Sequence, residues 1–318
     1  MLAKYKMYGI MWLRRFNMKK LIVLFTVCLF IFAACSNGND NSSDGAGNND
    51  SGGGTVTQIG IKAPTEPKEV GDIVFNDGSA TPYTENLRLT EDEKKAAIAL
   101  IFYKGTDLNN DEDTTTSRTL GVGLKQDILH LVWCSSSAQA HNKVITTIVC
   151  NPNTSTELPT FTGDKNGSDN LEQIGEFEGV NDTTGSGAEE IYPAFYFAQN
   201  YKNQKIGNET ESRIIPGSEY ATGWFLPTIA ELSRINACIN DSEDGVDLNA
   251  ASELCGGNKF ETQCYYWSSN QWVSDQSSDK DCAYGFGFGT KSHFYPDHKS
   301  ACDNSAQRGV TCAIREFN

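Results

Sequence analysis

Ten cysteines are the residues of this sequence with the most chemistry to offer. Cys28 and Cys35 lie in an N-terminal segment that resembles an export signal, which leaves eight for the rest of the chain. None of the eight forms a C-x-x-C pair, so a zinc ribbon or a thioredoxin-type site is not favoured. An even number in an exported protein favours disulfides. The pairing stays open, and the spacing allows three local bridges: Cys134–Cys150, Cys238–Cys255 and Cys302–Cys312.

Two other groups of residues have the chemistry of metal ligands. His293, Asp297 and His298 are close in sequence, but a site without metal is the favoured interpretation there. The segment 107–113 has the D-x-N-x-D-x-D spacing of a calcium loop. It lacks glycine at the sixth position and has Arg118 where the twelfth should be acidic, so a solvated acidic loop is favoured. We therefore expect no metal and no cofactor.

The N-terminus has the three parts of a secretory signal. The basic head Met18-Lys19-Lys20 precedes an apolar run from 21 to 32, and Ala33-Ala34-Cys35 follows. The run is shorter than the roughly 20 residues that span a bilayer. Small residues before cysteine indicate a bacterial lipobox, with Phe32 where leucine is more usual. We expect a signal peptide over 1–34 (with Met18 as an alternative start) and lipidation of Cys35; a soluble secreted protein is the alternative.

Composition divides the remaining chain in two. Residues 35–58 are rich in Ser, Asn and Gly, which predicts a flexible linker behind the lipid, and residues 59–318 have the composition of a single folded domain. Removing 1–34 leaves 20 basic and 41 acidic residues, a net charge of −21. Such an acidic chain repels nucleic acid, so the expected contact with a membrane is through the lipid anchor.

The elements that must position the functional residues are few helices and short strands. A short strand that leads into a turn is expected over 72–79, and strands are expected at 120–124, 131–134, 265–269, 283–288 and 309–315. Thr90 and Glu93 form a capping-box pattern before an apolar run at 96–103 that passes from helix into strand. Helices are expected at 191–201 and, with Thr228 as N-cap, at 229–236. This pattern, with long loops between the elements, predicts an α+β fold.

An ordered set of motifs carries a family resemblance. It comprises 223–232 (GWFLPTIAEL), 266–269 (YWSS), 283–289 (AYGFGFG) and 310–317 (VTCAIREF), with upstream elements at 71–79, 120–124 and 192–198. The order resembles the C-terminal domain of the Legionella collagen-like protein family and exported treponemal lipoproteins. The resemblance implies a C-type lectin-like fold of the formylglycine-generating-enzyme type. It implies that six residues form a structural frame: Trp224, Leu226, Pro227, Glu231, Trp267 and Arg315. A buried pair of Glu231 with Arg315 is one expectation.

The sequence is also similar to the variable proteins of diversity-generating retroelements. In that family the last strands and loops carry ligand-contact positions, which here implies a variable region within 265–315. Rigid aromatic side chains among adaptable polar ones suit a binding surface. The expected ligand-binding residues are Trp272, Ser274, Asp275, His293, Phe294, Tyr295, Asp297 and His298.

The resemblance leaves three functions to weigh. We expect a lipid-anchored surface protein that displays a binding domain for a protein or glycan ligand, on the outer membrane facing outward. A structural envelope lipoprotein is the first alternative. The second is a formylglycine-generating-type oxidase, which needs a reactive thiolate among Cys282, Cys302 and Cys312. No nucleophile elbow or catalytic carboxylate pair stands out, so we expect no enzyme activity.

Overall fold

The capping-box pattern begins the first helix, and the apolar run behind it forms a strand. Thr90 Oγ1 accepts a hydrogen bond from Glu93 N at 3.2 Å, and the Glu93 carboxylate accepts one from Thr90 N at 2.6 Å. Helix α1 (Glu91–Ala96) then passes directly into β3 (Ala97–Gly105), as expected. Seven consecutive residues of β3 are buried, which is typical of a strand that is covered on both faces.

The computed structural model describes residues 58–110, 113–127, 130–153, 159–240, 246–262, 264–273, 280–289, 293–301 and 309–317, apart from the side chains of 240 and 293. All of them belong to one compact unit, Val56–Asn318. The expected signal peptide, Cys35 and nearly all of the linker lie outside the described residues.

The larger sheet has six strands in the order β2-β1-β3-β4-β12-β7, and every neighbouring pair is antiparallel. Its strands are β1 (Asp72–Phe75), β2 (Ala80–Pro82), β3, β4 (Arg118–Gly123), β12 (Ile314–Glu316) and β7 (Trp224–Phe225). The C-terminal strand β12 therefore lies between two segments that come from much earlier in the chain.

The second sheet has four strands in the order β10-β9-β8-β11. Its strands are β8 (Tyr265–Gln271), β9 (Cys282–Gly287), β10 (His293–His298) and β11 (Gly309–Val310). The pairs formed by β9 are antiparallel, and β11 runs parallel to β8. A Cβ atom on Gly285 would lie 2.5 Å from the Tyr265 ring, so glycine there permits close packing of β9 on β8.

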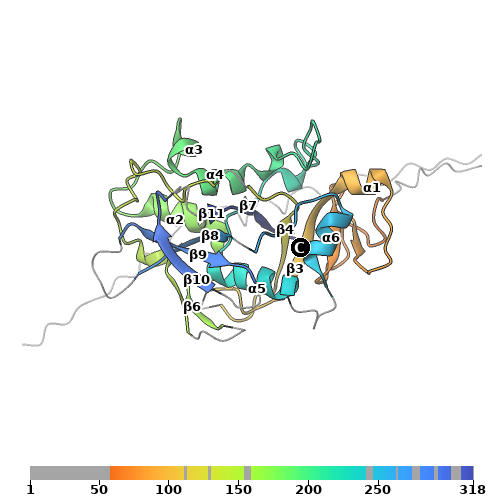
Figure 1. Cartoon of the computed structure of the whole chain (residues 1–318), viewed down its shortest axis with the longest axis horizontal. Helices are drawn as coiled ribbons and strands as arrows, with labels where there is room; N and C mark the ends of the chain where they lie inside the picture. The colour runs from red at the N-terminus through yellow and green to blue at the C-terminus, as the bar shows by residue number, and fades with distance from the viewer. Residues whose placement is uncertain are drawn as a thin grey trace, which may run out of the picture. The chain divides into compact units, whose positions relative to one another are not determined.

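Helices lie beside both sheets (Figure 1). They are α2 (Asn170–Glu176), α3 (Ala188–Ile191), α4 (Pro193–Gln199), α5 (Ile229–Asn240) and α6 (Leu248–Leu254), with short 3-10 turns η3 (Thr146–Ile148), η4 (Gly167–Asp169), η5 (Tyr201–Asn203) and η6 (Glu219–Ala221). A third, two-stranded sheet joins β5 (Cys150–Pro152) to β6 (Phe161–Gly163). Helix α5 contacts β3 of the large sheet and both β8 and β9 of the smaller one, so it connects the two sheets. The fold class is α+β, as expected.

Two strand predictions were wrong. Residues 131–134 form no strand because their polar groups have other partners: Leu131 O accepts from the Trp267 indole, and Val132 O accepts from Ala194 N. The segment predicted at 309–315 divides into β11 and β12, which belong to different sheets. The bend between them, around Cys312, carries the chain from one sheet to the other.

Candidate functional site

The expected ligand-binding residues gather on the four-stranded sheet, where β10 is an edge strand. Of the eight, Ser274 and Asp275 lie outside the described residues, and His293 is described only as the first position of β10. Phe294, Tyr295, Asp297 and His298 follow along the same strand, and Trp272 comes directly after β8. Because side chains alternate across a strand, the residues of β10 divide between two faces.

Phe294 and Trp272 are partly buried and pack against the larger hydrophobic core. The Phe294 ring meets the rings of Phe286 and Phe161 edge to face, with centroids 5.3 and 5.9 Å apart. These two predicted contact residues therefore have one side fixed by packing and the other open to solvent, as in a rigid aromatic anchor.

Tyr295 and Asp297 point to the other side of β10. Tyr295 packs against a second core cluster and stays partly exposed. The Asp297 carboxylate accepts a hydrogen bond from the Tyr265 hydroxyl at 2.5 Å and one from His298 N at 2.7 Å. The side chain of Asp297 is thus held in place before any ligand arrives.

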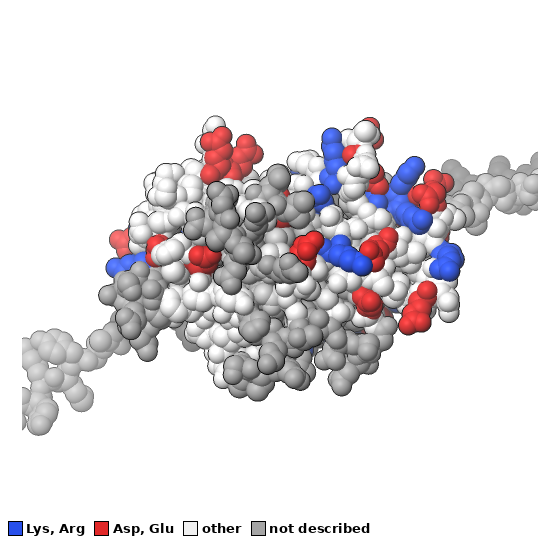
Figure 2. All heavy atoms as spheres, viewed as in Figure 1, with Lys and Arg blue, Asp and Glu red and all other residues white. Residues whose placement is uncertain are grey.

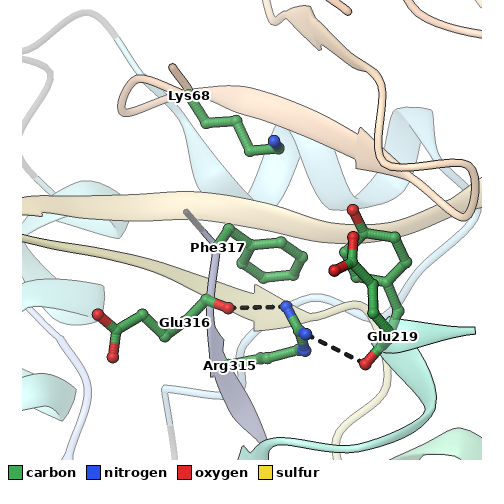
Figure 3. A pocket seen from close by; sticks show the side chains of 6 residues that line it. Lys68, Glu219, Arg315, Glu316 and Phe317 are labelled. Atoms are coloured by element: carbon green, nitrogen blue, oxygen red, sulfur yellow. Dashed lines mark hydrogen bonds between the residues drawn. The ribbon is translucent and has the colours of Figure 1, made fainter. Parts of the chain in front are cut away.

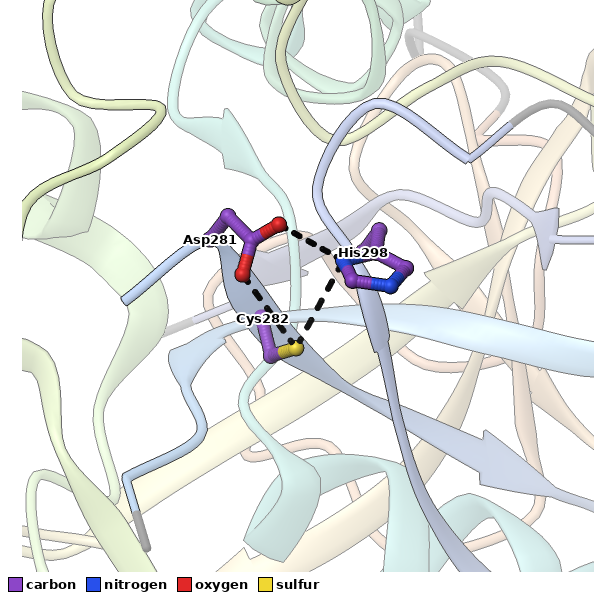
Figure 4. Close-up of side chains that lie close together, drawn as sticks. All are labelled: Asp281, Cys282 and His298. Carbon is purple, nitrogen blue, oxygen red and sulfur yellow. Dashed lines mark hydrogen bonds and ion pairs between the residues drawn. The ribbon is translucent and has the colours of Figure 1, made fainter. Parts of the chain in front are cut away.

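His298 lies beside two residues that were not expected to accompany it (Figure 4). Its Nδ1 atom is 2.7 Å from Asp281 Oδ2 and 3.9 Å from Cys282 Sγ. Cys282 Sγ is also 3.8 Å from Asp281 Oδ1. The sequence grouped His298 with His293 and Asp297 instead, because separation along the chain conceals a contact across two paired strands.

The frame residue Trp267 is fully buried, as is Trp133. Each of the two indoles donates a hydrogen bond to a backbone oxygen beside the other tryptophan. The Trp267 indole donates to Leu131 O at 2.8 Å, and the Trp133 indole donates to Ser268 O at 2.9 Å. The two rings therefore join β8 to the irregular segment 130–134. Sequence reasoning did not single out Trp133, although its position in an apolar run was a visible signal.

The other frame motif, Trp224 to Pro227, is buried and lies next to β8. The Trp224 indole donates to Tyr220 O at 2.7 Å, and Ser269 N donates to Pro227 O at 2.7 Å. Leu226, like Trp267, belongs to the second core cluster. The two motifs of the family resemblance are therefore in direct contact in the fold.

Glu231 is fully buried, and its charged partner is Arg118 rather than Arg315. Glu231 Oε1 is 3.1 Å from Arg118 Nη1, while Glu231 Oε2 accepts from Thr228 N at 2.8 Å to complete an N-terminal cap of α5. Burial raises the pKa of Glu231, against the opposing effects of Arg118 and Thr228. The expected pair failed because β12 directs Arg315 away from α5.

Arg315 instead lines a pocket with Lys68, Glu219, Tyr220, Glu316 and Phe317 (Figure 3). Its guanidinium donates to the backbone oxygens of Thr222, Glu219 and Glu316 at 2.9, 3.1 and 2.7 Å. It also lies over the rings of Tyr220 and Phe317, at about 5 Å from each centroid. Arg315 therefore connects the end of the chain to the η6 turn, which is a structural role.

Lys299 is a fully buried lysine directly after β10. Its ammonium donates to Ala140 O at 2.8 Å and Lys143 O at 3.0 Å, and it lies 5.0 Å from the Trp133 ring centroid. Burial lowers the pKa of Lys299 to about 8. No sequence signal could have shown this, because the oxygens come from a distant segment.

The calcium-like loop is held by protein contacts. Asp107 accepts a hydrogen bond from the Tyr103 hydroxyl at 2.7 Å and pairs with Arg234. Asp113 accepts from the backbone of Thr115 and Thr116. Residues 111 and 112 lie outside the described part, and the carboxylates that are described are occupied by these contacts.

The prediction of the three local disulfide bridges was wrong. Cys134, Cys255 and Cys312 are free thiols, and each of the three suggested bridges needs one of them. Burial raises the pKa of Cys134 and Cys255 to about 12, and it also raises the pKa of Cys312. They are protonated at neutral pH and lie in the core as small apolar side chains. The sequence could not reveal this, since cysteine spacing does not fix distance in space.

The surface charges agree with an acidic composition. On the face shown in Figure 2, acidic side chains stand at α3, which carries Glu189 and Glu190, while basic side chains gather toward α1 and α6 beside acidic ones. Within the described residues, no helix has the length and apolar character needed to cross a membrane.

Comparisons with known proteins give one distant structural likeness. No protein-family model matches the chain, and a search of curated proteins finds no match. A crystal structure of a fimbrial protein from Bacteroides ovatus is similar with a TM-score of 0.48 and 13% sequence identity. The match covers 78% of this chain and 48% of that protein, so the chain spans about half of its length.

Proposed function

We propose that the chain is a lipid-anchored envelope protein that displays a lectin-like domain on the cell surface and binds a protein or glycan ligand with the β10 region. The domain would have a C-type lectin-like fold of the formylglycine-generating-enzyme type. The lipidated residue would be Cys35, and residues 35–58 would be the tether. The motif order of the sequence supports the fold, and the small residues before Cys35 support the anchor.

One observation carries the binding part of the proposal. Edge strand β10 presents partly exposed aromatic and acidic side chains that core packing and hydrogen bonds already hold in place. Holding such side chains before binding reduces the entropy that a ligand must overcome. Pro296 is exposed on β10, and proline is typical of edge strands that do not pair further. Recognition would therefore use side chains of β10 rather than added backbone pairing.

The binding test uses the purified chain on a glycan array and a panel of host surface proteins. Tyr295→Ala and Asp297→Asn should each weaken binding by about tenfold or more, the range typical of well-packed contact residues. Ile215→Ala and Glu190→Gln alter exposed residues on other segments and should leave binding unchanged. Thermal unfolding of each variant controls for folding. No bound probe, or equal effects from all four variants, would overturn the proposal.

Expression of the unaltered chain and of a Cys35→Ala variant in bacteria tests the anchor separately. Cells that make the unaltered chain should retain it in the membrane fraction and incorporate an alkyne-labelled fatty acid into it. Cys35→Ala should abolish the label and release the chain, with ligand binding unaffected. A labelled Cys35→Ala chain would contradict the anchor and leave the binding proposal standing.

A further inference from the structure

Asp281, Cys282 and His298 bring three metal-ligand atoms together (Figure 4). The carboxylate oxygen, the Sγ atom and the imidazole nitrogen all lie within 4.8 Å of one another. Cys282 and His298 occupy directly opposite positions of β9 and β10, and Asp281 immediately precedes β9. Side chains at such opposite positions lie on the same face of a sheet, so the fold itself creates this juxtaposition.

The geometry distinguishes a metal site from a catalytic relay. In a cysteine–histidine–acid relay, one imidazole nitrogen faces the thiol and the other faces the carboxylate. Here the same atom, His298 Nδ1, faces both Cys282 Sγ at 3.9 Å and Asp281 Oδ2 at 2.7 Å. Figure 4 shows Nε2 directed away from both partners. Three donors that converge on one point are the arrangement of ligands around an ion.

The distances fit a small tetrahedral ion. Bonds of about 2.3 Å to sulfur and about 2.0 Å to nitrogen or oxygen place sulfur about 3.5 Å from the other ligand atoms, and nitrogen about 3.3 Å from oxygen. Cys282 Sγ is 3.9 Å from His298 Nδ1 and 3.8 Å from Asp281 Oδ1, and both distances are close to this value. The 2.7 Å contact of His298 Nδ1 is to the other carboxylate oxygen, Asp281 Oδ2. One oxygen can therefore serve as the ligand only if the Asp281 carboxylate turns and the short nitrogen–oxygen contact opens by about half an ångström, which the exposed His298 ring permits.

Ligand type selects the metal. A thiolate, an imidazole and a carboxylate together suit Zn²⁺, whereas Ca²⁺ and Mg²⁺ prefer oxygen ligands alone. Cys282 is 7% exposed, and the His298 side chain is 66% exposed. The buried thiolate would face the ion from the protein side, and the fourth position would be open to water.

Hydrogen bonds from Lys299 fix the backbone on both sides of the cluster. Lys299 N donates to Asp281 O at 2.6 Å, and the buried Lys299 ammonium donates to Lys280 O at 3.2 Å. The residues on each side of the cluster are therefore joined across the two strands, which fixes the relative positions of the ligand-bearing segments.

We infer that Asp281, Cys282 and His298 form a zinc site with three protein ligands and one open position. The inference does not depend on the proposed ligand binding, because zinc is measured on the purified chain without a ligand. Asp281 and Cys282 are not among the expected contact residues, and only His298 belongs to both sets.

The test uses the purified full chain and the metal alone. One equivalent of Zn²⁺ should remain after gel filtration, measured by elemental analysis. Replacement by Co²⁺ should produce a sulfur-to-cobalt charge-transfer band, which reports a thiolate ligand. Cys282→Ser should abolish that band, and His298→Gln and Asp281→Asn should each weaken metal binding by at least about tenfold. His298→Gln changes an exposed side chain, so its effect is separable from unfolding.

Two matched control variants test whether metal binding is specific to the three residues of the cluster. Cys264→Ser alters a half-buried cysteine outside the cluster, and Asp297→Asn alters the adjacent acid of β10. Both should retain one equivalent of zinc and the cobalt band. A chain that retains no metal, a band that persists in Cys282→Ser, or peptide mapping that finds Cys282 in a disulfide would overturn the inference.

Discussion

At the scale of single residues, burial decides what each ionisable side chain does. Glu231 and Arg118 are 0% and 2% exposed, and Arg118 is the charged partner of Glu231. Arg118 also lies 3.5 Å from the partly exposed Glu316 carboxylate. Arg118 also donates to Leu108 O at 2.6 Å. A buried pair of this kind contributes little as a whole, but the loss of one partner leaves an uncompensated charge in the core.

Glu231→Gln should therefore lower the free energy of unfolding by roughly 3 kcal/mol, because buried Arg118 keeps only the partly exposed Glu316, at 3.5 Å, as a counter-charge. Chemical denaturation measures the change. The exposed Glu190→Gln should change stability by less than about 0.5 kcal/mol. If the two variants were equally stable, the pair would not have the structural role assigned to it.

At the scale of elements, the reciprocal tryptophans determine how segment 130–134 attaches to β8. Each indole N–H bonds to a backbone oxygen of the other segment, so both segments must be in place for either bond to form. This arrangement replaces the strand pairing that the sequence had led us to expect at 131–134.

Trp133→Phe and Trp267→Phe should each lower stability by about 1–3 kcal/mol, because a buried carbonyl oxygen loses its donor while an aromatic ring remains. Trp272→Phe is the matched control on a half-buried ring of the same sheet and should have a smaller effect. Denaturation of the three variants measures this, and a Trp272 effect as large as the other two would contradict the account.

At the scale of the whole molecule, buried carboxyls make stability depend on pH. Burial raises the pKa of Asp164 to about 7, with Glu231 nearby adding to the shift. An unfolded aspartate has a pKa of about 3.9, so the folded chain holds more protons than the unfolded chain between about pH 4 and pH 7. Stability should fall as pH rises through that window.

The fall should be on the order of a few kcal/mol, and Asp164→Asn should remove much of it, because the amide does not titrate. Urea denaturation at a series of pH values measures the slope. Glu172→Gln, which changes an exposed acid of α2, is the control and should keep the slope. Equal slopes for the two variants would exclude Asp164 as the cause.

The sequence by itself determined the local features of this protein. The capping boxes at Thr90 and Thr228, the strands at β1, β3, β4, β8 and β9, and the α+β class all depend on nearby residues, so their patterns could be recognised. It also brought attention to β10, where most of the described binding candidates lie together on one edge strand.

Only the tertiary structure decided which distant residues meet. Glu231 pairs with Arg118 rather than Arg315, Cys134, Cys255 and Cys312 are free thiols, and His298 lies against Asp281 and Cys282. The physical reason is the same in each case. Register across a sheet and packing between sheets set these distances, whereas sequence spacing constrains only the residues within one turn or one strand.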